Sequence, residues 1–210
     1  MSLTLWHGKD TRSLRALWTL EEMGLDYHLE MVPFPPRLLQ PSYLEVNPLG
    51  TLPYLIDGDT RMTESSGICH YLVDKYGPTE LGLTVEHPEY GNYLNWLYHS
   101  DATLTFPQTL YLRYALMEPE ERRQPQVAED YVQWYMSRLR MLDTHLLDHD
   151  YLCASRFTIA DIAVGYALYL GRTFGLVEAY KPQTEAYFQK LIARPAFQRA
   201  NSMDLPPTSG

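Results

Sequence analysis

The spacing of apolar residues changes in kind near residue 80. Before that point, short apolar runs alternate with helical patterns. Leu3 to Trp6 is typical of a strand, Arg12 to Met23 of a helix, and Tyr27 to Val32 of a second strand. These elements predict a β-α-β unit. A run of prolines that starts at Pro33 then breaks the chain, and we expect a loop as far as Asn47.

A hairpin and a helix follow the loop. The apolar runs Pro53 to Ile56 and Arg61 to Thr63 flank the turn sequence Asp57-Gly58-Asp59, which favours a two-residue hairpin connection. Residues from Ser65 to Tyr76 then carry apolar side chains at helical spacing. The order β-α-β-β-β-α predicts a thioredoxin-like domain over residues 1–80.

The rest of the chain shows no alternation typical of strands, and we expect an all-α helical domain over residues 86–205. Two helical patterns are long, one from Val132 to Leu146 and one from Ile159 to Leu170. Thr158 and Asp161 have the spacing of a capping box at the start of the second pattern. We interpret that pair as structural and predict an α+β protein of two domains.

Charge and composition narrow the function classes. The 210 residues carry a formal charge of −9 without a basic patch, which argues against nucleic acid and anionic membranes as partners. No run of about 20 apolar residues or signal peptide is apparent, so we expect no membrane span. Cys69 and Cys153 stand alone, and no His/Cys cluster indicates a metal. We expect a cytoplasmic protein without a metal ion.

Two dipeptides have the chemistry to bind a small charged peptide. A cis Leu52-Pro53 bond would turn the backbone N–H and C=O of Leu52 outward, where a peptide could pair with them. Glu64-Ser65 stands where a helix begins, and helix N-termini receive carboxylates well. The alternatives are an ordinary turn proline and a simple helix cap.

These residues resemble the glutathione transferase family, in which the proline is cis and a Glu-Ser pair holds the γ-glutamyl end of glutathione. The resemblance extends over nearly the whole chain. It includes Ser13 to Trp18 and Leu20-Glu21-Glu22 in the first helix, and Phe157 to Ile162 in the second half. It implies an enzyme of detoxification with glutathione as substrate, and it implies a homodimer.

The family activates glutathione by stabilising its thiolate, because a thiol with a pKa of about 8.5 is mostly protonated at neutral pH. A tyrosine-type member would have Tyr where this chain has Trp6, and no cysteine stands in the following turn. The serine-type, theta-like pattern places a hydroxyl four residues before the helix arginine, which gives Thr11 as the catalytic residue. Ser13 and His7 are the alternative activating groups, and Thr11 could instead be only the helix N-cap.

The resemblance implies further contacts to both substrates. Gln40 lies where relatives bind the glycine carboxylate of glutathione, and Arg37 is the alternative. Asp101 lies near the position of an acidic group that acts across the subunits of related dimers, and Phe106 could line a cleft between the domains for an apolar electrophile. The alternative for Phe106 is helix packing.

The sequence therefore predicts a glutathione transferase with an apolar, electrophilic second substrate. Peroxidase, dehalogenase or isomerase activity on the same fold stays open, since the electrophile decides the reaction. A carrier or scaffold that binds glutathione without catalysis is the alternative from another class, because Thr11 replaces the usual serine.

Overall fold

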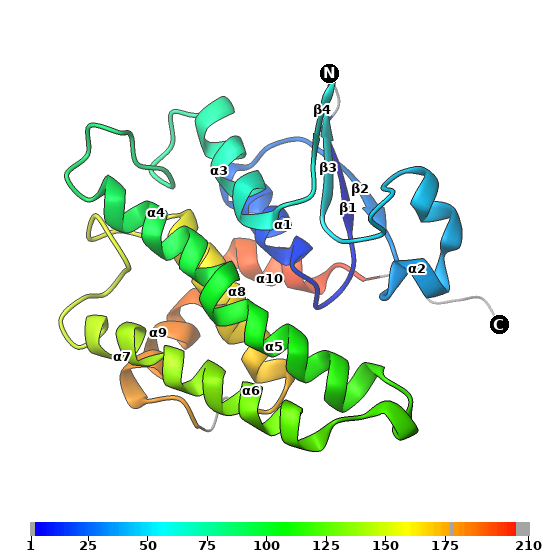
Figure 1. Ribbon diagram of the computed structural model, residues 1–210. Helices are drawn as coiled ribbons and strands as arrows, with labels where there is room; N and C mark the ends of the chain where they lie inside the picture. Colours follow the sequence, from blue (N-terminus) through cyan, green and yellow to red (C-terminus); the bar gives the residue numbers. More distant parts are fainter. Residues whose placement is uncertain (1–2, 177–178, 205–210) are drawn as a thin grey trace. The chain divides into compact units, whose positions relative to one another are not determined.

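The computed structural model describes residues 3–176 and 179–204 of the chain. They divide into two compact units (Figure 1). The first unit combines the chain up to Gly82 with the residues from Ile192 onward, and the second comprises Leu83–Leu191.

The first unit is built on a four-stranded sheet in the order β2-β1-β3-β4. Strand β1 pairs in parallel with β2 and antiparallel with β3, which pairs antiparallel with β4. The strands are β1 (Leu3–His7), β2 (His28–Met31), β3 (Tyr54–Asp57) and β4 (Thr60–Met62). Up to Gly82 the helices are α1 (Ser13–Met23), α2 (Pro36–Leu39), the 3-10 helix η1 (Pro41–Glu45) and α3 (Ser65–Lys75). This order confirms the predicted thioredoxin-like fold.

The segment between β2 and β3 differs from the loop that the sequence predicts. Pro36 and Pro41 each stand in the first turn of a short helix, α2 or η1. A proline is tolerated there because the first N–H groups of a helix have no partner within the helix. Pro36 and Pro41 thus start two short helices in the segment that the sequence predicts as a loop.

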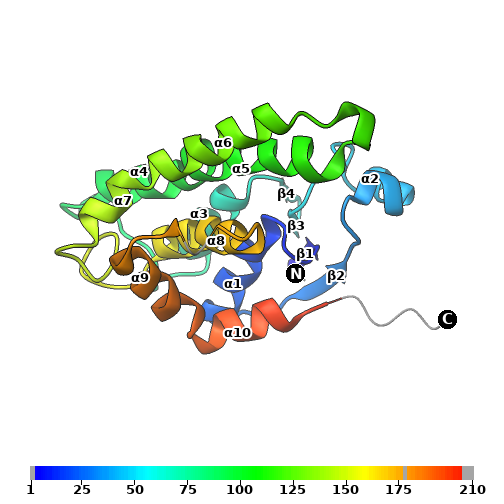
Figure 2. The ribbon, with the colours of Figure 1, turned by 90° about the horizontal axis from the view of Figure 1, so that it is seen from below.

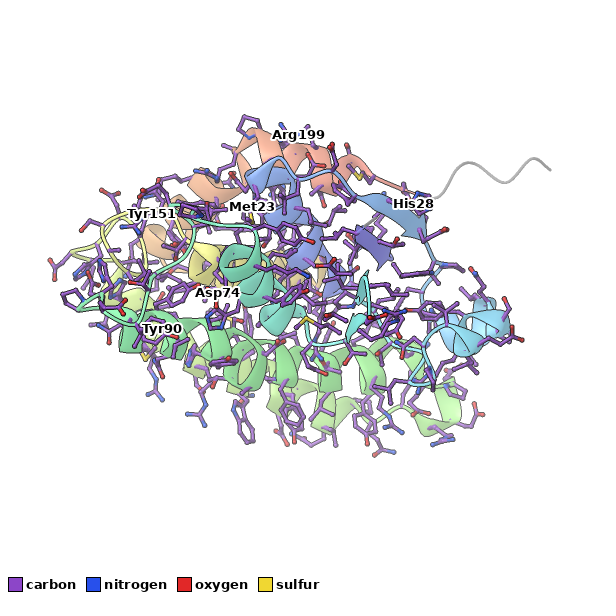
Figure 3. The ribbon with its side chains drawn as sticks, turned by 90° about the horizontal axis from the view of Figure 1, so that it is seen from above. Met23, His28, Asp74, Tyr90, Tyr151 and Arg199 are labelled. Atoms are coloured by element: carbon purple, nitrogen blue, oxygen red, sulfur yellow. The ribbon has the colours of Figure 1, made fainter. Side chains whose placement is uncertain are left out.

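A final helix, α10 (Pro195–Ser202), belongs to the first unit and packs against α1 (Figure 2). Arg194 forms a bidentate ion pair with Glu22, at 2.6 and 2.9 Å, and Arg199 pairs with Glu21 at 2.6 Å. In Figure 3, the label Met23 marks the last residue of α1, and the label Arg199 marks a residue within α10.

Helix α10 lies within the predicted helical domain over residues 86–205. The sequence predicts one helical domain from residue 86 to residue 205, whereas the residues from Ile192 onward group with the first unit. The physical reason is the pairing of α10 with the acidic end of α1. Residues 1, 2, 177, 178 and 205 of the predicted domains lie outside the described residues.

The second unit is helical in its described part, as predicted. Its elements before residue 125 are α4 (Tyr90–His99), the π-helix η2 (Ser100–Thr105), α5 (Phe106–Tyr111), the π-helix η3 (Leu112–Met117) and the 3-10 helix η4 (Glu120–Arg122). The later ones are α6 (Pro125–Arg138), α7 (Arg140–His145), α8 (Ile159–Thr173) and α9 (Pro182–Ile192).

Helix α8 forms the centre of the second unit, and most of its side chains are buried. Its start has the predicted capping box. The Thr158 side chain accepts from the Ala160 N–H, and the Asp161 carboxylate accepts from the Thr158 N–H at 2.8 Å. Buried Gln108 ties α5 to α8 by donating to the carbonyl of Ala167 at 2.9 Å.

No helix in the described ranges is long and apolar enough to cross a membrane. Within the same ranges, no group of three or more His, Cys, Asp or Glu side chains is arranged to hold a metal ion. Both cysteines are free and buried.

Candidate functional site

The turn between β1 and α1 contains a buried network of hydroxyl groups. Oγ1 of Thr11 lies 2.7 Å from the carbonyl oxygen of Gly8 and 2.6 Å from Oγ of Ser13. Oγ of Ser13 also lies 2.7 Å from Nδ1 of His7 and accepts from the N–H of Gly8 at 3.2 Å. The three side chains proposed as activating groups are therefore hydrogen-bonded partners rather than independent alternatives.

Burial distinguishes these three side chains. Ser13 is fully buried, His7 is 2% exposed and Thr11 is 7% exposed, so Thr11 is the most accessible member. Burial lowers the pKa of His7 to about 4, although the Asp204 carboxylate and a hydrogen bond with the Ser13 backbone act in the opposite direction. His7 is thus neutral at pH 7. Arg12 is the N-cap residue of α1 and makes no side-chain capping bond, whereas Oγ1 of Thr11 accepts from the Ser13 N–H at 3.4 Å.

Gly8 brings the turn close to the loop that precedes β3. A Cβ at this position would lie 2.7 Å from Cδ1 of Leu52 and 2.9 Å from the carbonyl oxygen of Val32. It would also lie 3.4 Å from Cγ2 of Thr11. The missing side chain of Gly8 therefore allows Thr11 and Leu52 to approach the same point from two segments of the chain.

The Leu52-Pro53 peptide bond is cis, as predicted. Asn47 shapes the loop before it, with Nδ2 donating to the Thr51 carbonyl at 2.9 Å and Oδ1 accepting from the Leu49 N–H at 3.1 Å. No hydrogen bond joins the Leu52 N–H or C=O to another residue in the described part of the chain. The backbone of Leu52 is thus available for pairing with an extended peptide.

The start of helix α3 is the third segment of the site, after the turn that follows β1 and the loop that precedes β3. Glu64 is its N-cap residue, exposed, and makes no side-chain capping bond; its Oε1 accepts from the Thr63 hydroxyl at 3.1 Å. Ser65 is 2% exposed, and its Oγ accepts from Nη1 of Arg15 at 3.0 Å. Arg15 is fully buried on α1, so it connects the start of α1 to the start of α3.

The sequence did not predict that Arg15 contacts Ser65; Arg15 served there only as the helix arginine that stands four residues after Thr11. A fully buried arginine is unusual, because burying a charge is costly unless it is hydrogen-bonded. Its position one turn into an apolar helix was the available signal.

The two residues predicted for the glycine carboxylate lie in the segment between β2 and β3. Gln40 is half-buried at the junction of α2 and η1, where its N–H donates to the Pro36 carbonyl at 2.8 Å. Arg37 is exposed, and the stem of its side chain covers Gly50, where a Cβ would lie 2.3 Å from Cγ of Arg37. Both residues are in the same unit as Thr11 and Leu52.

Asp101 and Phe106 belong to the second unit. Asp101 is half-buried in η2, and Phe106, at the start of α5, is 49% exposed with its ring edge-on to Tyr131 at 6.5 Å. The π-helix is explained by Pro107, which has no N–H to continue the regular ladder.

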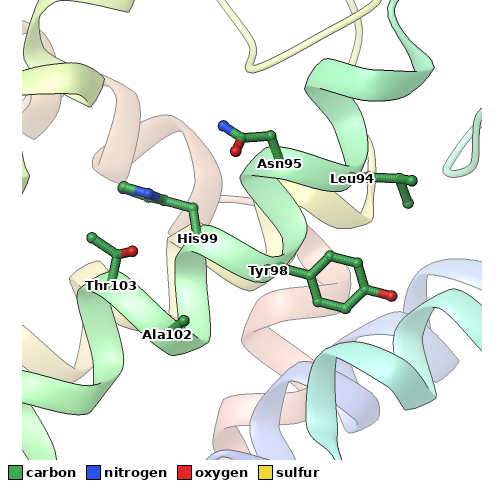
Figure 4. Close-up of a pocket in the computed structure, with 6 residues that line it drawn as sticks. All are labelled: Leu94, Asn95, Tyr98, His99, Ala102 and Thr103. Atoms are coloured by element: carbon green, nitrogen blue, oxygen red, sulfur yellow. The ribbon is translucent and has the colours of Figure 1, made fainter.

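A shallow hollow of about 350 Å³ lies on α4 and η2 (Figure 4). It is lined by residues of α4 and η2, namely Leu94, Asn95, Tyr98, His99, Ala102 and Thr103. Asp101 and Phe106 are not among these lining residues. The two side chains predicted for the second substrate therefore lie outside this hollow.

Comparison with known proteins gives consistent results over both units. The chain matches the family model of the glutathione S-transferase N-terminal domain over residues 11–75 and that of the C-terminal domain over residues 108–195. It is 30% identical to glutathione S-transferase F9 of Arabidopsis thaliana over 199 residues, which cover 88% of this chain and 89% of that protein. Identity to glutathione S-transferase 3 of Schizosaccharomyces pombe is 24%, over 92% and 84% of the two chains.

Solved structures give the same result. The glutathione transferase URE2P6 from Phanerochaete chrysosporium, in complex with oxidized glutathione, has a TM-score of 0.82 at 27% identity and covers 95% of this chain and 94% of that one. Ure2p5 from the same organism, cocrystallized with 1-(S-glutathionyl)-2,4-dinitrobenzene, has a TM-score of 0.79 at 25% identity, over 95% and 92%.

Proposed function

Because the chain belongs to the glutathione S-transferase family, we propose that it catalyses the general reaction of that family, attack of the glutathione thiolate on an apolar electrophile. The conjugate 1-(S-glutathionyl)-2,4-dinitrobenzene bound to a similar protein is a product of such an attack. It supports an electrophilic aromatic ring as the first compound to assay.

The observation that carries this proposal is the convergence of three segments within the first unit. Gly8 lies against both Thr11 and Leu52, and Arg15 joins the start of α1 to Ser65 at the start of α3. A tripeptide with a central thiol and a carboxylate at each end needs such an arrangement: a hydroxyl donor, a backbone pairing edge and an anion-binding helix start.

Each segment has a distinct proposed role. The Thr11 hydroxyl donates to the glutathione sulfur and is the catalytic residue, while the backbone of Leu52, fixed by Pro53, pairs with the central residue of the tripeptide. Ser65 and the start of α3 bind the γ-glutamyl carboxylate. Glu64, exposed at the N-cap, pairs with the γ-glutamyl ammonium group. Gln40 binds the glycine carboxylate, and Arg37 is the alternative.

The remaining expectations are part of the same proposal. Asp101 and Phe106 serve the second substrate or act across subunits of a homodimer, and exposed Phe106 is compatible with either role. The protein acts in the cytoplasm, where thiols such as Cys69 and Cys153 stay reduced.

One observation favours the alternative of a glutathione carrier without catalysis. In the structure, the Thr11 hydroxyl lies 2.7 Å from the Gly8 carbonyl oxygen and so directs its proton away from a ligand. A carrier would keep that bond with glutathione present, whereas an enzyme would exchange it for a bond to sulfur.

Ultraviolet titration of the glutathione thiolate on the purified protein tests the proposal. We expect a bound thiol pKa at least one unit below the free value of about 8.5. Thr11→Val, which has nearly the same shape but no hydroxyl, should raise the bound thiol pKa most of the way back to the free value. Thr11→Ser should preserve the lowered pKa because it keeps the hydroxyl. A bound pKa equal to the free value in the wild-type protein would support the carrier instead.

A further inference from the structure

The three shortest contacts of the hydroxyl network in the turn after β1 have one consistent arrangement of protons. Each hydroxyl has a single proton to donate, and a carbonyl oxygen can only accept. The 2.7 Å contact with the Gly8 carbonyl therefore uses the proton of Thr11. The 2.6 Å contact between the two hydroxyls then requires Ser13 to donate to Thr11.

The same reasoning fixes the tautomer of His7. Since Ser13 donates to Thr11, its 2.7 Å contact with Nδ1 of His7 requires the imidazole to donate. The Gly8 N–H donates to the same oxygen, so Ser13 accepts two hydrogen bonds. Its own proton is directed to Thr11 at 2.6 Å, and the longer contact of its Oγ with the Gly8 carbonyl, at 3.3 Å, shares that proton. The network is a chain in one direction, from the Nδ1–H of His7 through Ser13 to Thr11.

We propose that His7 and Ser13 are positioning residues that hold the Thr11 hydroxyl in one orientation and polarise it as a donor to the glutathione sulfur. The proposal rests on the proposed function, in which Thr11 contacts that sulfur. When a thiolate accepts from Thr11, only the bond from Thr11 to the Gly8 carbonyl is exchanged, and the bonds from His7 and Ser13 stay in place. A hydroxyl that accepts a hydrogen bond is a stronger donor, because successive hydrogen bonds polarise one another.

The first test is spectroscopic and needs no ligand. Nitrogen-15 NMR of the imidazole in the full chain should show His7 as the neutral Nδ1–H tautomer between pH 6 and pH 8. The burial that holds the pKa of His7 at about 4 keeps the ring neutral over this range. The Nε2–H tautomer would reverse the chain at Ser13 and overturn the proposal.

The second test is the pKa of glutathione's thiol bound to variants of the protein. Ser13→Ala and His7→Leu each interrupt the chain of hydrogen bonds that ends at Thr11. We expect each variant to raise the bound thiol pKa by about half a unit, which is less than the effect of Thr11→Val. His7→Asn places an amide N–H near the position of Nδ1 and should restore the wild-type value. If both interrupting variants match the wild type, the proposal is wrong.

A ligand without a thiol separates positioning from damage to the fold. Binding of S-methylglutathione, measured by calorimetry, should be unchanged in Ser13→Ala and His7→Leu, since this ligand has no thiolate to stabilise. A parallel loss of its affinity would mean that the network only supports the turn. Thr19→Val is the matched control, because it removes another fully buried hydroxyl from α1 and should leave the thiol pKa unchanged.

These measurements also distinguish failure of this proposal from failure of the proposed function. If Thr11→Val raises the thiol pKa while Ser13→Ala and His7→Leu do not, Thr11 acts without the chain. If Thr11→Val has no effect, the assignment of Thr11 is wrong, and the positioning roles are wrong with it.

Discussion

The starts of helices α3 and α8 solve the same problem in opposite ways. The first N–H groups of any helix have no partner within it. At the start of α8 they are served by the chain itself: Thr158 and Asp161 form a reciprocal capping box, and Asp161 also accepts from the Leu152 N–H at 3.1 Å and the Tyr187 hydroxyl at 2.8 Å. At the start of α3, the N-cap side chain of Glu64 is exposed and makes no capping bond.

The difference separates a structural helix start from one suited to a ligand. The start of α8 is buried and its capping groups are hydrogen-bonded within the protein, so we expect it to contribute to stability and not to ligand binding. The start of α3 combines the positive end of the helix dipole with an exposed N-cap carboxylate that makes no capping bond, a combination that fits a ligand with both an anionic and a cationic group. Changes at α8 should therefore alter folding, and changes at α3 should alter binding.

The largest effect should come from Asp161→Ala. Its carboxylate accepts four hydrogen bonds and is fully buried, so its removal leaves buried donors without partners. We expect the free energy of unfolding to fall by about 3–5 kcal/mol. Denaturant titration measures this. A loss below about 1 kcal/mol would show that the α8 start is not the structural element described here.

The pH dependence of stability gives the next largest effect. Burial raises the pKa of Asp161 to about 6, although the bonds from Thr158, Tyr187 and Leu152 act to lower it. Because the pKa of Asp161 is higher in the folded protein than in the unfolded chain, protonation of this carboxyl stabilises the folded state. This contribution to the free energy of unfolding is fully present below about pH 4 and is lost as the pH rises through about 6.

Asp161→Asn does not titrate, so we expect the stability difference between wild type and this variant to narrow by roughly 2–3 kcal/mol between pH 4 and pH 7. Thermal unfolding at matched pH values gives the measurement. A difference that widens with pH would mean that hydrogen bonding dominates burial at this carboxylate.

Glu64→Ala tests the other side of the comparison. Loss of a carboxylate paired with the γ-glutamyl ammonium should weaken glutathione binding by on the order of 1.5–3 kcal/mol. The free energy of unfolding should change by less than about 0.5 kcal/mol, because the side chain is exposed. Calorimetric titration and denaturant unfolding provide the two values. Unchanged affinity would make Glu64 an ordinary surface residue.

The smallest effect is expected from Glu64→Asp, which should give α3 the side-chain cap that its N-cap residue does not provide. Asp is a good N-cap residue, and Glu64→Asp shortens the side chain so that it can accept from the first turn of its own helix. We expect the free energy of unfolding to rise by about 0.5–1 kcal/mol while glutathione affinity falls. Thr158→Ala is the reciprocal control, with a loss of about 1 kcal/mol and no direct effect on the ligand. A rise in both stability and affinity for Glu64→Asp would contradict a trade between capping and binding.

Sequence predicted those features that depend on neighbouring residues. Thr158 and Asp161 are three positions apart, and the cis bond lies within the Leu52-Pro53 dipeptide itself. The hydroxyl network escaped prediction because it depends on how the turn folds: Asp10 adopts a φ of 58°, and His7 and Ser13 meet across it. The contact of Arg15 with Ser65 spans 50 positions and has no local pattern.

Helix α10 illustrates why distant pairing is hidden. Pro195 is the expected end of a helix when only local sequence is considered, yet it opens a new one in its first turn. The acidic partners of that helix, Glu21 and Glu22, lie 178 and 172 positions earlier in the sequence. No local pattern there indicates that they form ion pairs with Arg199 and Arg194.

The pairing of α1 with α10 also sets an order of events during synthesis. Glu22 and Arg194 are 172 positions apart, and Trp18 packs edge-on against Phe197 at 4.9 Å. While the ribosome is producing the helical unit, Trp18 has no Phe197 to cover it and α1 lacks both of its arginine partners. The unit that begins first is therefore completed last, and the nascent chain exposes an apolar face of α1 throughout translation of the segment between them.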